Sequence, residues 1–184
     1  MIETIKKNGG HSKPQKNMTM ILAEALKVDV HIRSGSWAKL LPNADDTCCK
    51  AAKAAIEAAD ISAINMEVSV VLADDIFIRS LNKFWRQQDI PTNVLAFPCE
   101  NTPAAEGKIR LLGDIVVADG VIQKEALEER KPIADHLAHM VVHGALHLLG
   151  YNHVSDEGAR EMEGLEKVAL ATLDVENPYS ENEI

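Results

Sequence analysis

The stretch HMVVHGALHLLGYNH, residues 139–153, decides how the second half of this chain folds. Its apolar residues and its histidines recur at helical spacing, so it predicts a helix that ends just before Gly150. Gly150 stands where a C-terminal cap belongs and lets the chain reverse direction. His143 and His147 lie four residues apart on one face of that helix, and the reversal carries His153 back toward them.

Three histidines at this spacing predict a metal site. The pattern H-x-x-x-H-x-x-G-x-x-H has the spacing of the metzincin zinc motif, H-E-x-x-H-x-x-G-x-x-H. Three protein ligands leave one position open for water, as in catalytic zinc sites, and zinc acidifies that water. We therefore expect one ion per chain on His143, His147 and His153, either zinc or another transition metal such as nickel or copper.

The residue after the first ligand distinguishes this site from a metalloprotease. Metzincins carry their general base, a glutamate, at that position, and this chain has Gly144. The two other histidines on the helix stripe, His136 and His139, lie nearer the helix start. We expect His139 to support a ligand or to pack in the core, and His136 to be exposed or to cap the helix.

The hydrophobic pattern predicts strands and helices up to residue 118 and helices alone after it. The expected strands are residues 28–33, 66–73, 94–97 and 111–118. The expected helices are residues 45–59, 74–86 and 120–130, a helix from Pro132 to about Leu149, and a last helix opened by Ser155 and Asp156 that ends near Leu173. In the helix 74–86 we expect Asp74 as the N-cap and an apolar side made of Ile76, Ile78, Leu81 and Phe84.

This order of elements favours an α+β domain over a doubly wound fold. We expect a small mixed β-sheet of about four strands packed by five to six helices. The length of 184 residues suits a single domain. We place that domain at residues 21–178, between a flexible basic N-terminal tail, residues 1–20, and a C-terminal tail, residues 179–184.

The composition restricts where the chain acts and how it meets nucleic acid. With 19 Lys and Arg against 28 Asp and Glu the net charge is −9, so any RNA must bind a local basic patch. Arg79, Lys83 and Arg86 form a stripe at helical spacing, although most such stripes are solvated helix faces. The three cysteines form no disulfide framework, and no apolar run is long enough to span a membrane. We expect a cytoplasmic protein without a membrane partner.

Four blocks of the sequence together resemble the YbeY family. Residues 139–153 resemble its signature H-G-x-x-H-x-x-G-Y-D-H with the helix that leads into it. IPTNVLAFP (90–98) resembles P-T-[DN]-V-L-S-F-P, LLGDIVVA (111–118) resembles an L-G-D-I segment, and EMEGLE (161–166) resembles M-E-x-L-E. The blocks come in the family's order and span roughly residues 28–178.

The resemblance implies a fold, an activity and a site. Family members have a small mixed sheet packed by helices, and they are metal-dependent, single-strand-specific endoribonucleases. They act in 3′-end maturation of small-subunit (16S) ribosomal RNA and in ribosome quality control. The implied partners are ribosomal RNA, the small ribosomal subunit and its assembly factors. The implied metal ligands are His143, His147 and His153, and the implied functional arginine is Arg86.

Some residues near the implied site are open to two interpretations. A guanidinium at Arg86 could hold a phosphate through two hydrogen bonds. Asp89, Asn93 and Asp114 would either orient the metal's water or cap loops, and Tyr151 would pack or stack on a base. Two residues depart from the family pattern: Asn152 replaces an aspartate and Ala96 replaces a serine. A metalloprotease-like hydrolase and a non-catalytic ribosome assembly factor are the alternative functions.

Overall fold

The computed structural model describes residues 26–63, 65–99 and 109–179. The expected N-terminal tail and residues 180–184 of the expected C-terminal tail lie outside these ranges. Within them the chain forms one α+β domain, as predicted. No helix in the described ranges combines the length and the apolar character that crossing a bilayer requires.

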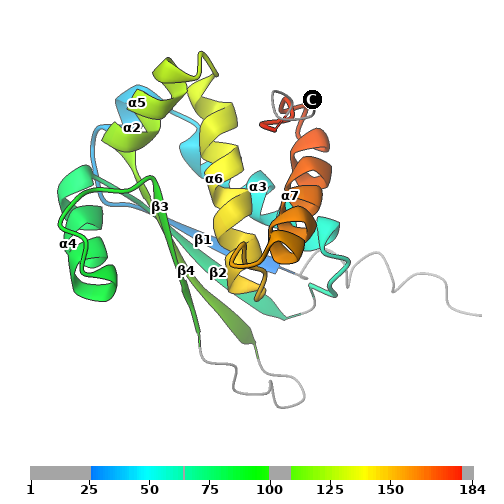
Figure 1. Ribbon diagram of the computed structural model, residues 1–184. Coiled ribbons are helices and arrows are strands. Elements are labelled where there is room, and N and C mark those ends of the chain that lie inside the picture. The colour runs from blue at the N-terminus through cyan, green and yellow to red at the C-terminus, as the bar shows by residue number, and fades with distance from the viewer. Residues whose placement is uncertain (1–25, 64, 100–108, 180–184) are drawn as a thin grey trace, which may run out of the picture.

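A four-stranded mixed sheet forms the centre of the domain (Figure 1). The strand order is β1-β2-β4-β3, with β1 (Leu26–Ile32), β2 (Met66–Ala73), β3 (Val94–Pro98) and β4 (Arg110–Ala118). β2 pairs in parallel with both β1 and β4, and β3 pairs antiparallel to β4 at one edge. All four strands were predicted, with ends that differ by no more than about two residues, the usual uncertainty of element boundaries.

Six helices surround the sheet in the described part of the chain. They are α2 (Trp37–Leu40), α3 (Ala44–Ala58), α4 (Asp75–Arg86), α5 (Asp119–Glu128), α6 (Ile133–Leu148) and α7 (Asp156–Ala171). The sequence predicts all except α2, which is shorter than the window in which a helical period can be recognised. Its Trp37 is fully buried, and its indole Nε1 donates to the carbonyl oxygen of Ala73 at 3.0 Å.

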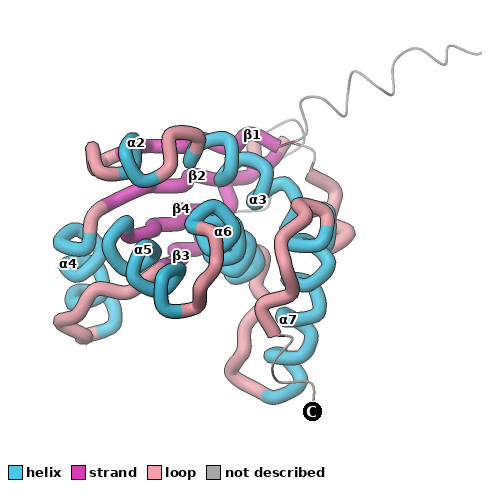
Figure 2. The backbone as a smooth tube through the Cα atoms, turned by 90° about the horizontal axis from the view of Figure 1, so that it is seen from above, coloured by secondary structure: helices cyan, strands magenta, loops and turns pink. Residues whose placement is uncertain are grey.

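The two faces of the sheet are covered unequally. α3 and α6 pack on one face and α7 packs against both of them, so this side holds the large hydrophobic core (Figure 2). α4 lies on the other face, where a smaller cluster around Ile78, Leu95 and Val116 forms. Next to α4 this face is hollowed by a cavity of about 1110 Å³, lined in part by Trp85 and Phe97.

The apolar side that we expected on α4 is only partly correct. Ile78 is buried, whereas Ile76 is 81% exposed and Phe84 is 76% exposed. Leu81 is partly buried and packs with Ile78 in the small cluster. Since α4 covers only part of the open face, Ile76 and Phe84 remain outside that contact. Its predicted N-cap is confirmed, because the Asp74 carboxylate accepts from the backbone N–H of Phe77 at 2.7 Å.

Candidate metal centre

α6 carries the first two ligand candidates and lies directly on the sheet. Its Gly144 faces β4, where a Cβ added to the glycine would come within 2.8 Å of Ile115 Cγ2. A larger residue would push the helix off the strand. After α6, Gly150 adopts φ +102°, a left-handed conformation that glycine takes without strain. The chain turns there and returns toward the helix.

The reversal brings three imidazoles together, as the spacing predicts. Ring centroids of His143 and His147 are 4.5 Å apart, and His153 lies 5.5 Å and 5.2 Å from them. One nitrogen from each ring fits in a group whose members all lie within 4.8 Å of one another. His153 is exposed and the two helical histidines are half-buried, so the group opens to solvent on one side.

Hydrogen bonds fix which nitrogen each helical histidine offers. His143 Nδ1 lies 2.8 Å from the carboxylate Oε1 of Glu166 on α7, and His147 Nδ1 lies 2.9 Å from the carbonyl oxygen of Tyr151. Both partners accept, so both Nδ1 atoms donate, and each ring turns its Nε2 away from that partner. The two Nε2 atoms are 3.0 Å apart. A cation bound beside them would be within reach of both nitrogens.

The separation of the two helical Nε2 atoms suits a tetrahedral ion. Zinc–nitrogen bonds of roughly 2.0–2.1 Å at a tetrahedral angle hold two nitrogens about 3.3 Å apart, and the observed Nε2 atoms are separated by 3.0 Å. The residues present therefore fit a transition metal with a fourth position open. Three imidazoles accept zinc, nickel or copper alike.

The surroundings of His147 and Glu166 shift the pKa values of both side chains. Burial lowers the pKa of His147, and the neighbouring His143 lowers it further against the opposing hydrogen bond to Tyr151, so the ring is neutral at neutral pH. Burial alone would raise the pKa of Glu166, but hydrogen bonds from His139, His143 and Tyr179 outweigh it and lower the pKa to about 2. A metal binds the neutral form of an imidazole, so the lowered pKa of His147 favours metal binding.

The two remaining histidines of the stripe behave differently from each other. His139 supports a ligand indirectly, because its Nε2 lies 3.1 Å from the Glu166 oxygen Oε2. The prediction that His136 is exposed or caps the helix is wrong. His136 is 4% exposed, and its Nε2 lies 2.8 Å from Glu125 Oε2. α5 packs against the first turns of α6 and encloses this ring.

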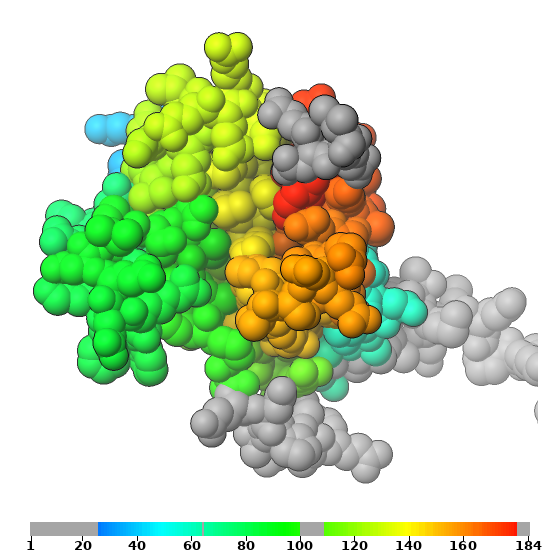
Figure 3. Space-filling model, in the orientation of Figure 1, coloured from blue at the N-terminus to red at the C-terminus, as the bar shows by residue number. Residues whose placement is uncertain are grey.

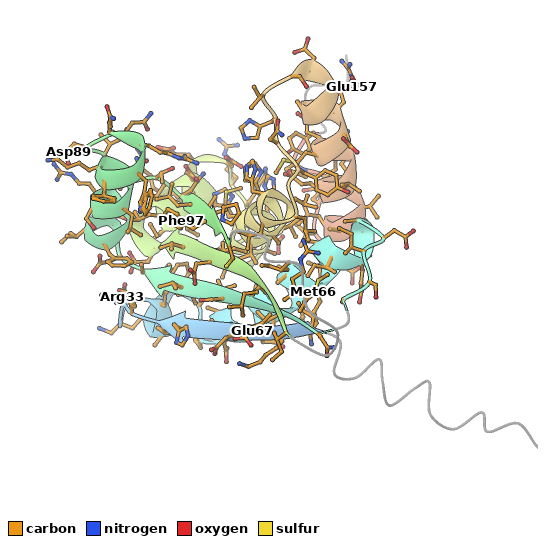
Figure 4. All side chains as sticks on the ribbon, turned by 90° about the horizontal axis from the view of Figure 1, so that it is seen from below. Arg33, Met66, Glu67, Asp89, Phe97 and Glu157 are labelled. Atoms are coloured by element: carbon orange, nitrogen blue, oxygen red, sulfur yellow. The ribbon has the colours of Figure 1, made fainter. Side chains whose placement is uncertain are left out.

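The expected basic stripe on α4 is largely paired. Arg79 and Lys83 both contact Asp89, each at 2.8 Å, and their hydrogen bonds, first from Lys83 and then from Arg79, lower the pKa of Asp89. Figure 4 shows Asp89 at the end of α4, well away from Glu157 at the start of α7. Arg86, the last residue of α4, is exposed, and its guanidinium forms no hydrogen bond or ion pair with any described residue, the three histidines included.

Asn93 and Asp114 make no polar contact with the histidines in the described ranges. Asn93 binds the carboxylate of Glu125 and the backbone N–H of Val94, and Asp114 borders the hollow on the open face of the sheet. Tyr151 packs against the main core and offers its backbone oxygen to His147. Asn152 accepts from the backbone N–H of Val154 at 3.2 Å, so it shapes the turn around His153.

Sequence reasoning missed Glu166 and Tyr179. A signal for Glu166 exists, because it shares a helical stripe with the buried residues Met162, Ala169 and Leu170, where an acid is out of place. Tyr179, placed by the sequence in a C-terminal tail, donates its hydroxyl to Glu166 Oε2. No local sequence pattern predicts the contact between Tyr179 and Glu166.

In the space-filling view α6 (yellow) lies between the surface of β3 and α4 (green) and that of α7 (orange) (Figure 3). An open group of three histidines on a helix packed over a small mixed sheet defines an α+β protein with a candidate metal site.

Comparisons with known proteins place this class in a family. The family model described as endoribonuclease YbeY matches residues 34–174. Endoribonuclease YbeY of Paramagnetospirillum magneticum is 43% identical over 159 residues, which cover 85% of this chain and 97% of that protein. Endoribonuclease YbeY of a Bradyrhizobium species is 46% identical over 145 residues, which cover 77% and 86%. The solution structure of TM1509 from Thermotoga maritima is 26% identical, covers 83% of this chain and 95% of its own, and has a TM-score of 0.48. The chain belongs to the YbeY family, as the four sequence blocks indicate.

Proposed function

We propose that this chain is a metal-dependent, single-strand-specific endoribonuclease that acts in 3′-end maturation of small-subunit ribosomal RNA and in ribosome quality control. Its partners are ribosomal RNA, the small ribosomal subunit and assembly factors, and it works in the cytoplasm. Membership of the YbeY family supports the reaction class, since the relatives are named as endoribonucleases.

One observation carries the proposal for this chain itself. The Nε2 atoms of His143 and His147 face each other at 3.0 Å beside an exposed His153, and one ring nitrogen from each of the three lies within 4.8 Å of the others. We assign these three residues as the ligands of one zinc ion. When bound, the ion supplies a Lewis acid that polarises a phosphate oxygen and makes water a nucleophile at neutral pH.

The basic residues of α4 bind and orient the RNA. Arg86 is the cation of the α4 stripe that is not committed to Asp89, so its guanidinium is available for a phosphate of the RNA. A planar fork can hold two phosphate oxygens and stabilise the charge that builds up on them in the transition state. Arg79 and Lys83 contribute mainly to attracting the strand.

The packing of α6 argues against the metalloprotease alternative. The glutamate of a metzincin would stand at Gly144, and that position faces Ile115 on β4 at a distance that excludes even a Cβ. A general base at this point of the helix would point into the sheet and away from the ligands.

A cleavage assay on an end-labelled ribosomal RNA precursor tests the proposal. Zinc-loaded wild-type protein should cleave the RNA, and His147→Ala, which removes a ligand, should not. Elemental analysis of both proteins should give about one metal per wild-type chain and far less in the variant. Binding to small subunits without any cleavage would favour the assembly-factor alternative. Digestion of casein by metal-loaded protein would favour the metalloprotease alternative.

A further inference from the structure

Glu166 is a buried acid directly behind the histidine site. Glu166 is 1% exposed and lies on α7, which packs against α6. Burying a carboxylate is costly unless donors replace the lost water. Three donors do so here: His143 Nδ1 on Oε1 at 2.8 Å, His139 Nε2 on Oε2 at 3.1 Å, and the Tyr179 hydroxyl on Oε2.

The two oxygens of Glu166 are used differently. Oε2 receives His139 and Tyr179, and Oε1 receives His143. The terminal torsion of a glutamate is soft when the carboxylate is free. With two donors holding one oxygen, rotation is blocked and the other oxygen stays directed at His143.

His143 therefore has a different partner from the other helical ligand. His147 donates to a neutral backbone carbonyl at 2.9 Å, whereas His143 donates to a carboxylate. A charged acceptor forms the stronger bond, fixes the ring more firmly and raises the basicity of the nitrogen on the opposite side of the imidazole.

Tyr179 reaches this cluster from beyond the last helix. α7 ends at Ala171, and the chain then turns back so that the Tyr179 ring lies edge-on to His139 with centroids 6.0 Å apart. The Lys167 ammonium lies 5.8 Å from the centre of the Tyr179 ring. The tyrosine is thus held in place by residues of both α6 and α7.

We propose that Glu166 is a positioning residue that holds His143 in the tautomer presenting Nε2 to the metal, and that Tyr179 and His139 lock the carboxylate for this task. The inference deepens the proposed function and rests on it for the presence of a metal. It assigns roles to three residues outside the proposed set of metal ligands.

Three variants of the full chain test the inference. Glu166→Gln leaves one acceptor oxygen for three donors and turns an amide N–H toward one of them, so zinc affinity should fall about 10–100-fold. Tyr179→Phe removes one hydrogen bond and little volume, so affinity should fall ~2- to 10-fold. Glu161→Gln is the matched control: it lies exposed on the same helix and should keep wild-type affinity.

Zinc affinity would be measured by competition with a chromogenic chelator, and the histidine tautomers of metal-free protein by long-range ¹H–¹⁵N NMR. Wild type and Glu161→Gln should show His143 protonated on Nδ1, and Glu166→Gln should show a mixture of tautomers. A structural role alone would lower the unfolding temperature without moving the tautomer.

If Glu166→Gln does not fold, the zinc affinity and the His143 tautomer of Tyr179→Phe test the inference. Unchanged zinc affinity and an unchanged tautomer in the folded variants would overturn the inference. A wild-type protein that binds zinc but does not cleave RNA would refute the proposed endoribonuclease activity. The zinc affinities of the variants would still test the role of Glu166. Wild type without zinc affinity would refute both.

Discussion

Replacing Gly144 with alanine would test how closely α6 must approach the sheet. The new Cβ would lie 2.8 Å from Ile115 Cγ2 and 3.4 Å and 3.5 Å from its Cγ1 and Cδ1. Ile115 is completely buried on β4 and is β-branched, so it has few rotamers with which to give way. Either the helix or the strand must shift.

The expected magnitude combines two opposing terms. Overpacking of a well-packed core costs about 1–3 kcal/mol. Alanine in place of glycine inside a helix gains about 1 kcal/mol. Gly164 on α7 isolates the second term, because a Cβ added there meets nothing within 4 Å. Gly164→Ala should therefore stabilise the protein by up to about 1 kcal/mol, and Gly144→Ala should be less stable than Gly164→Ala by about 1–3 kcal/mol.

Urea unfolding followed by circular dichroism measures both variants, with equal m-values as the condition for comparing their free energies of unfolding. Because Gly144 adjoins His143, the shift of α6 should also weaken zinc binding in Gly144→Ala and leave it intact in Gly164→Ala. A Gly144→Ala protein as stable as Gly164→Ala, with unchanged zinc affinity, would refute the close packing.

Other expectations concern the metal, the arginine and acid stability. His147→Ala should lose most of the bound metal while keeping its circular dichroism spectrum; retained stoichiometric metal in elemental analysis would mean a different ligand set. Arg86→Glu should reduce RNA cleavage by roughly 10²–10³-fold or more with metal content unchanged, and Arg86→Lys should stay partly active; loss of metal in Arg86→Glu would make the arginine structural. The pKa of Glu166 is lowered from an ordinary value of 4.5 to about 2, so its contribution to stability is complete above pH 4.5 and is lost as the pH falls toward 2. At 1.36 kcal/mol per pKa unit this is about 3 kcal/mol, and Glu166→Gln should lack that part of the pH dependence in chemical denaturation at pH 5 and pH 2.5.

The grouping of the three histidines could be predicted from the sequence because it depends only on helix geometry and one turn. A four-residue step fixes two imidazoles on one helix face, and a glycine after the helix allows the turn that returns His153. Strand β2 was predicted with its exact bounds, since its β-branched run ends at the capping Asp74.

The parts that could not be predicted depend on tertiary contacts. Glu166 meets His143 across 23 residues of chain, and Glu125 meets His136 across 11. The burial of His136 follows from the packing of α5, which the histidine stripe does not encode. The pairing of Arg79 and Lys83 with Asp89 depends on the path of the loop after α4.

The hydrogen bond from Tyr179 to Glu166 also affects where the chain can be truncated without loss of the proposed site. The family match ends at residue 174, and α7, the last helix of the described residues, ends at Ala171. A truncated protein that stopped there would retain the complete sheet, all six helices and every proposed ligand. It would lack the hydroxyl that holds Glu166 Oε2, so on our proposal we expect it to bind zinc more weakly although its secondary structure is unchanged. The unit that we propose to bind zinc therefore extends past α7 to Tyr179.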